Sequence, residues 1–156
     1  MNKARSDSAP AADHLELERF LPYRLSVLTN RISNALARNY AERFTLSVAD
    51  WRVMAVLGRF GADTATAVCR HTAMDKVTVS RATARLLKRE FLLRKTDPQD
   101  RRRTIFSLSP PGQDIHDQIV PIALAHEAEL LAGLGADEIA SLDHLLAKLT
   151  DQQTPD

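Results

Sequence analysis

Cationic side chains gather in one segment of the chain, between Arg70 and Arg103. This segment contains eleven Lys or Arg residues and four Asp or Glu residues, so its formal charge is +7. Residues 1–69 carry +2 and residues 104–156 carry −8, so the overall charge of +1 conceals the asymmetry. Guanidinium and ammonium groups at this density can bind phosphate groups, or they can form a solvated surface that keeps the protein soluble. Their placement on the predicted elements separates these two interpretations.

The first group of cations lies on a predicted helix from about Lys76 to Arg89. Asp75 precedes this helix, and its carboxylate can accept hydrogen bonds from the free N–H groups of the first turn. At 100° per residue one face of the helix is apolar and consists of Val79, Ala82, Thr83 and Leu86. The opposite face carries Thr78, Arg81, Arg85 and Lys88. We therefore expect one face to be buried and the other to be cationic.

The second group, Arg101, Arg102 and Arg103, ends the polar stretch that begins at Asp97. Two short runs rich in β-branched and apolar residues flank this stretch, Phe91–Thr96 and Thr104–Leu108. Such a pattern predicts a β-hairpin with a charged tip.

Other helices must position these two groups. Apolar residues repeat every three or four positions from Leu15 to Phe44, where Pro22 should bend the helix or delay its start. Ser47 and Asp50 form a capping box, which predicts a second helix that ends near Gly58–Gly61. The remaining predicted elements are a short helix over Thr64–His71, a connector Thr72–Met74, a helix opened by Ser109-Pro110-Pro111 and kinked at Pro121, and a last helix after Gly135. We expect residues 1–13 to be a disordered tail.

A helix, a short helix, a tight connector, a capped cationic helix and a hairpin, in that order, are typical of a winged helix-turn-helix. The fold class is therefore mainly α with a small β-hairpin wing. In such a module the second helix of the pair enters the major groove of DNA, and the wing arginines reach a minor groove. On the helix, the residues predicted to contact base edges are Lys76, Thr78, Ser80 and Arg81, and those predicted to neutralise phosphates are Arg85 and Lys88. In the wing, we expect Asp97 and Asp100 to orient Arg101, Arg102 and Arg103 through charge-assisted hydrogen bonds.

The chain resembles the MarR family of bacterial transcriptional regulators from about Leu15 to Thr150. Asp97–Arg103 followed by Leu108–Gly112 is similar to the family's wing signature, and Met74–Arg81 is similar to the start of its recognition helix. This resemblance implies one domain over residues 14–151, with dimerisation helices at about 15–44 and 110–150 and a winged module at about 46–108. It also implies a homodimeric repressor that binds a pseudo-palindromic operator. A phenolic or other organic anion would act as effector in a crevice near Trp51.

Several alternatives remain open at this point. A protein-binding adaptor on the same fold would explain the helices but has no need for three arginines at a hairpin tip. Cys69 is either a redox switch, as in the peroxide-sensing branch of the family, or a small buried hydrophobic residue. Trp51 is either a residue of the hydrophobic core or part of the effector crevice. Lys88, Arg89 and Lys95 are either DNA contacts or solvated residues.

The sequence contains no phosphate loop, nucleophile elbow or Cys/His ligand set, so we expect no enzyme, no metal and no cofactor. The first twenty residues contain no apolar segment, and the longest apolar run is seven residues. We therefore expect a cytoplasmic protein that does not cross a membrane. The resemblance further implies a bacterial protein that associates with the nucleoid when it is bound to DNA.

Overall fold

The structure, a computed structural model, describes residues 15–153. The predicted tail, residues 1–13, lies outside the described residues. The chain divides into two compact units, residues 1–33 and residues 34–156, and we describe each by itself. Among the described residues no single helix is long and apolar enough to cross a membrane; the two last helices satisfy that test only as a pair bent by 111°.

The described part of the first unit contains a turn and the beginning of helix α1 (Leu21–Phe44). Backbone N–H groups of Arg19 and Phe20 donate to the carbonyl of Glu16, which closes the turn. The helix therefore begins later than the apolar pattern predicts, with Pro22 in its first turn, where a missing N–H costs nothing. The delay expected from this proline is confirmed.

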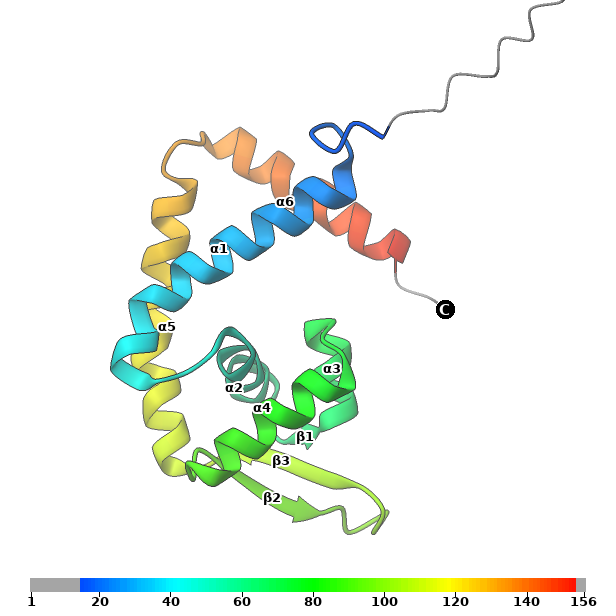
Figure 1. Cartoon of the computed structure of the whole chain (residues 1–156), viewed down its shortest axis with the longest axis vertical. Coiled ribbons are helices and arrows are strands. Elements are labelled where there is room, and N and C mark those ends of the chain that lie inside the picture. The colour runs from blue at the N-terminus through cyan, green and yellow to red at the C-terminus, as the bar shows by residue number, and fades with distance from the viewer. Residues whose placement is uncertain (1–14, 154–156) are drawn as a thin grey trace, which may run out of the picture. The chain divides into compact units, whose positions relative to one another are not determined.

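The second unit is built around one apolar core. It contains the end of α1, α2 (Val48–Phe60), α3 (Ala65–Thr72), α4 (Lys76–Lys88), α5 (Pro110–Leu131) and α6 (Ala136–Gln153). Figure 1 shows α2, α3 and α4 grouped beside a small sheet. The core combines side chains from all of these helices except α6, and its fully buried members include Tyr40, Val53, Met54, Val68, Val79, Leu86 and Ile119.

The sheet has three strands rather than the two of the predicted hairpin. Its strands are β1 (Asp63–Thr64), β2 (Leu92–Thr96) and β3 (Thr104–Leu108), in the antiparallel order β1-β3-β2. The hairpin strands pair as predicted, with Leu92 opposite Leu108 and Thr96 opposite Thr104. The prediction missed β1 because a two-residue strand has no alternation of its own and exists only by pairing with β3.

Short polar side chains cap the N-termini of α2, α3, α4 and α5. The Ser47–Asp50 capping box is present in both directions, with distances of 3.1 Å and 3.0 Å. Ser109 caps α5: its hydroxyl accepts from the N–H of Gly112 at 3.1 Å and donates to the carbonyl of Glu90 at 2.5 Å. This contact ties the start of α5 to the end of α4. The fold class, mainly α with a small β wing, is confirmed.

Candidate nucleic-acid interface

The N-terminus of α4 is fixed by Asp75, as predicted. Its carboxylate accepts from the N–H of Thr78 at 2.8 Å and from the hydroxyl of the same residue at 2.6 Å. These hydrogen bonds lower the pKa of Asp75, because they stabilise the charged carboxylate. The hydroxyl of Thr78 is therefore occupied within the chain, which is a different role from the predicted contact to a base edge.

The buried and exposed faces of α4 follow the helical wheel. Val79, Ala82, Thr83 and Leu86 are all buried. The exposed residues are Lys76, Val77, Ser80, Arg81, Ala84, Arg85 and Lys88. Of the predicted DNA contacts on this helix, all except Thr78 are exposed: Lys76, Ser80, Arg81, Arg85 and Lys88.

Arg85 has a partner inside the protein. Its guanidinium donates to Asp50 Oδ1 from Nη2 at 2.8 Å and from Nε at 3.1 Å. The same Nη2 lies 3.3 Å from the hydroxyl of Ser47. Asp50 is buried, so the pair connects α4 to the capping box of α2. The structure therefore gives Arg85 a positioning role in addition to the predicted contact with a phosphate. Sequence reasoning missed this role because Asp50 lies 35 residues away from Arg85 in the sequence.

Arg89 makes a second connection, at the end of α4. Its guanidinium donates to the carbonyls of Phe44 and Thr45, each at 2.7 Å, and lies 4.5 Å above the ring of Phe91. The carbonyls at the end of α1 thereby gain donors that the helix itself does not supply. Arg89 and Lys88 are both exposed, and Arg89 also has these partners inside the protein, which neither interpretation of it included.

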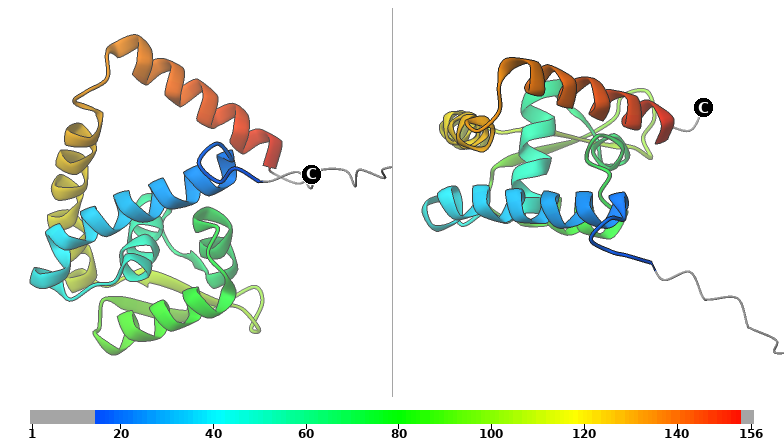
Figure 2. Two further views of the ribbon diagram at one scale, coloured as in Figure 1. Left: turned by 45° about the horizontal axis from the view of Figure 1, so that its top comes forward. Right: turned by 90° about the horizontal axis from the view of Figure 1, so that it is seen from above.

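The wing carries Arg101, Arg102 and Arg103 at its tip, and all three are exposed. Figures 1 and 2 show this tip extending toward the same end of the module as the N-terminal end of α4. The exposed cations of the wing tip and of the first turns of α4, Lys76 and Arg81, therefore belong to segments whose backbones lie at the same end of the second unit.

Asp97 and Asp100 shape the backbone of the wing tip. The carboxylate of Asp97 accepts from the N–H of Gln99 at 2.9 Å, and that of Asp100 accepts from the N–H of Arg102 at 3.0 Å. Asp100 also lies 3.6 Å from Nε of Arg102, an ion pair of exposed groups that is too long for a hydrogen bond. The predicted charge-assisted hydrogen bonds to the arginine side chains are thus replaced by bonds to the loop backbone, which a short carboxylate reaches more easily.

A hollow of about 450 Å³ lies beside the wing, between the start of α3 and the start of β3, and no local sequence pattern indicates it. Its lining combines the start of α3 with the beginning of β3, so it depends on the pairing of β1 with β3. The lining residues are Thr64, Ala65, Thr66, Arg102, Arg103, Thr104 and Phe106. Two cations and three hydroxyls at such a position suit an anion.

A second hollow, of about 370 Å³, lies between α2 and α5. Trp51, Arg59 and His116 line it, and the rings of Trp51 and His116 are 5.7 Å apart. On its other side Trp51 lies 6.0 Å from Tyr40, whose burial raises the pKa of its hydroxyl to about 12. Trp51 therefore contacts both the core and the hollow. A Cβ added at Gly58 would lie 2.3 Å from Nε2 of His116, so only glycine permits this close approach.

The other candidate residues show no reactive arrangement. Cys69 is partly buried and packs against the core, as a small hydrophobe would. Within residues 15–153, no three His, Cys, Asp or Glu side chains come together as a metal site.

Comparison with known proteins agrees with this geometry. Residues 44–103 match the model of the MarR family. The multiple antibiotic resistance protein MarR of Salmonella typhimurium is 26% identical over 138 residues, which are 81% of this chain and 88% of that protein.

Two solved structures are also similar. The crystal structure of a probable transcriptional regulator from Pseudomonas aeruginosa is 32% identical, covers 85% of this chain and 98% of its own, and has a TM-score of 0.72. The structure of Bordetella bronchiseptica BpsR, concerned with regulation of its DNA binding by 6-hydroxynicotinic acid, is 26% identical, with a TM-score of 0.78 and coverage of 88% and 98%. These relatives are regulators rather than enzymes, as the sequence predicts. The chain belongs to the MarR family of transcriptional regulators.

Proposed function

We propose that this regulator is a homodimeric repressor that binds double-stranded DNA in the bacterial cytoplasm, at the nucleoid, and releases it when a small molecule binds. The observation that carries the proposal is the exposure of cations on two elements, α4 and the wing tip, at one end of the same unit. An adaptor that binds only proteins would not require both. The proposed division places the winged module at about 46–108 and the dimerisation helices at about 15–44 and 110–150.

In this proposal α4 lies in the major groove. Lys76, Ser80 and Arg81 are exposed near its N-terminus, where a recognition helix approaches the base edges, and Arg81 has the reach and the paired donors to read guanine. Lys88 neutralises a phosphate. Arg85 and Thr78, which make contacts inside the protein, hold the helix in place.

The wing enters the adjacent minor groove. A guanidinium inserted there meets the concentrated negative potential of a narrow groove, and Arg101, Arg102 and Arg103 are all available to supply it. The hollow between α3 and β3 binds a neighbouring phosphate beside Thr66.

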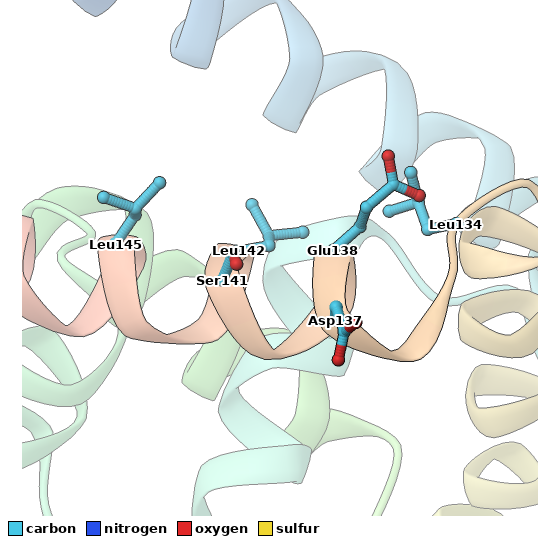
Figure 3. Close-up of a pocket in the computed structure, with 6 residues that line it drawn as sticks. All are labelled: Leu134, Asp137, Glu138, Ser141, Leu142 and Leu145. Atoms are coloured by element: carbon cyan, nitrogen blue, oxygen red, sulfur yellow. The ribbon is translucent and has the colours of Figure 1, made fainter.

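A second copy of the chain would cover the exposed apolar residues of α6. This helix buries none of its residues, and Leu142, Leu145, Leu146 and Leu149 are all exposed. Figure 3 shows Leu142 and Leu145 directed to one side of the helix, with Leu134 at the other end beyond Glu138, around a hollow of about 430 Å³. A twofold dimer presents two α4 helices about 34 Å apart, the spacing of successive major grooves on one side of DNA.

The hollow beside Trp51 is the proposed effector site. Aromatic walls and the guanidinium of Arg59 suit a flat organic anion, phenolic or carboxylic. The relative BpsR has its DNA binding regulated by 6-hydroxynicotinic acid, an aromatic acid of this class. An anion in this hollow would change the position of α2, to which Arg85 connects α4.

The first experiment selects bound fragments from genomic DNA and then measures affinity for the selected duplex against salt. We expect log K to fall with log salt, at a slope of about −0.9 for each neutralised phosphate. The double variant R101A/R102A should weaken binding to every sequence and make the slope shallower by about one or two, while R81A should relax preference at one position in each half-site.

K148A is the matched control, because Lys148 lies on α6, far along the chain from the basic segment. We expect its slope to equal that of the native protein. Binding that does not depend on salt, or the absence of any selected duplex, would favour the adaptor and contradict the proposal.

A further inference from the structure

One apolar side chain stands out on the exposed face of α4. Val77 is 57% exposed, although its neighbours on that face are polar or very small. It lies about 200° around the helix from buried Val79, so it points away from the core, while Arg81, Ala84 and Lys88 return to within about 40° of it. These four residues form a line along the outermost surface of α4.

No structural role of Val77 explains why a valine occupies this position. It contributes nothing to the core, whose α4 members are all on the opposite face. The cap of the helix is made by Asp75 and Thr78, and a β-branched residue lowers helix propensity slightly. Single apolar residues on a surface are common, so exposure alone carries no conclusion. The informative feature is its place, in the first turn of the helix and one turn before Arg81.

We propose that Val77 contacts the C5 methyl group of a thymine in the major groove and thereby determines one base of each half-site. The inference rests on the proposed function, since it requires α4 in that groove. The thymine methyl is the apolar group that base pairs present there, and small apolar side chains recognise it. The first-turn residues of a recognition helix are those that reach base edges.

Ala84 supports this placement of the helix. It lies seven residues after Val77, about 10 Å along the axis at 1.5 Å per residue. Its side chain is a single methyl group and is exposed, so the middle of α4 can lie close to the groove floor without a clash. Within the same line Arg81 reaches a base edge beside Val77, and Lys88, near the end of the helix, suits a phosphate.

The test uses the selected duplex with each thymine replaced in turn by deoxyuridine, which removes the methyl group and keeps the O4 acceptor. For the native protein we expect one position in each half-site at which affinity falls about fourfold, the value of one buried methyl group. V77A should bind the thymine duplex more weakly by a similar factor and should no longer distinguish thymine from uracil at that position. V77T, which retains the branched shape and one methyl, should keep part of the discrimination.

F60A is the control, because Phe60 at the end of α2 is 57% exposed, as Val77 is, and its loss removes apolar surface outside α4 and the wing. We expect F60A to keep the native response to uracil, and thermal unfolding to show that all variants are folded. Salt-dependent binding of the native protein that ignores every thymine replacement would overturn the role of Val77 and leave the proposed function intact. The same conclusion follows if V77A still discriminates at the native position. Failure to bind any duplex would instead overturn the proposed function, and the role of Val77 with it.

Discussion

Separating the two partners of the Asp50–Arg85 pair should destabilise the protein and weaken DNA binding together. The variants D50N and R85M remove one charge each and nearly preserve the shape of the side chain. If the pair positions α4, each single variant and the double variant D50N/R85M should weaken operator binding similarly, because all three lose the same connection to α2. If Arg85 instead binds a phosphate, R85M and the double variant should weaken binding, whereas D50N should not.

The expected magnitude follows from exposure. The side chain of Asp50 is 5% exposed and that of Arg85 is 49% exposed. Breaking a fully buried pair costs about 3–5 kcal/mol, whereas an exposed pair contributes about 0–1 kcal/mol. A buried carboxylate with a half-exposed partner lies between these limits, so we expect R85M to lower the free energy of unfolding by about 2 kcal/mol. The coupling between the two positions should be about 1–2 kcal/mol.

Urea denaturation of the four proteins in the cycle measures the coupling, and duplex titration against salt measures the second effect. With a positioning role R85M should leave the salt slope unchanged, whereas loss of a phosphate contact makes the slope shallower by about one. A coupling below about 0.3 kcal/mol, with a shallower slope for R85M alone, would refute the reasoning and restore Arg85 as a phosphate contact.

Three further predictions concern single positions. G58A should force the ring of His116 to move and should lower stability by about 1–3 kcal/mol. It should also reduce the response to an effector, which thermal unfolding with and without ligand measures. An unchanged melting temperature would contradict the close approach of Gly58 to His116. S109A should lower the free energy of unfolding by about 1–2 kcal/mol, as urea denaturation measures, because the carbonyl of Glu90 and an N–H of α5 each lose a hydrogen-bond partner. An unchanged free energy of unfolding would show that water replaces both hydrogen bonds. Hydrogen bonds to Thr78 lower the folded-state pKa of Asp75, so the stabilisation that this carboxylate contributes is present above pH 3.8 and is lost as the pH falls further. D75N caps the helix without titrating and should lose less stability than the native protein between pH 5 and pH 3. The same loss of unfolding free energy in both proteins over this range would disprove the prediction.

Local rules predicted the elements that have local causes. The capping box at Ser47, the cap at Asp75 and the buried face of α4 are encoded within a few residues, so spacing and residue type were sufficient. The hairpin was predicted for the same reason. The start of α1 was placed too early because the apolar pattern continues through a turn that the chain forms before Pro22.

Contacts between distant segments were not predictable from the pattern. Arg85 lies at a similar angle around α4 to Arg81, which predicts a contact with a phosphate. Nothing near Arg85 in the sequence indicates that it bonds to the carboxylate of Asp50. The strand β1 and the hollow between α3 and β3 exist only through the pairing of β1 with β3. Asp97 was expected to hold arginine side chains, but backbone donors in the same tight loop are closer.

The segregation of charge has a kinetic consequence. The segment with α4 and the wing carries +7 and the segment after residue 103 carries −8, so a nearby polyanion exerts a torque on the molecule as well as an attraction. Encounters with duplex would begin with the cationic end already turned toward the phosphates, and fewer collisions would be unproductive. The almost neutral total charge at the same time limits indiscriminate adhesion, so orientation rather than overall attraction would set the speed of the search.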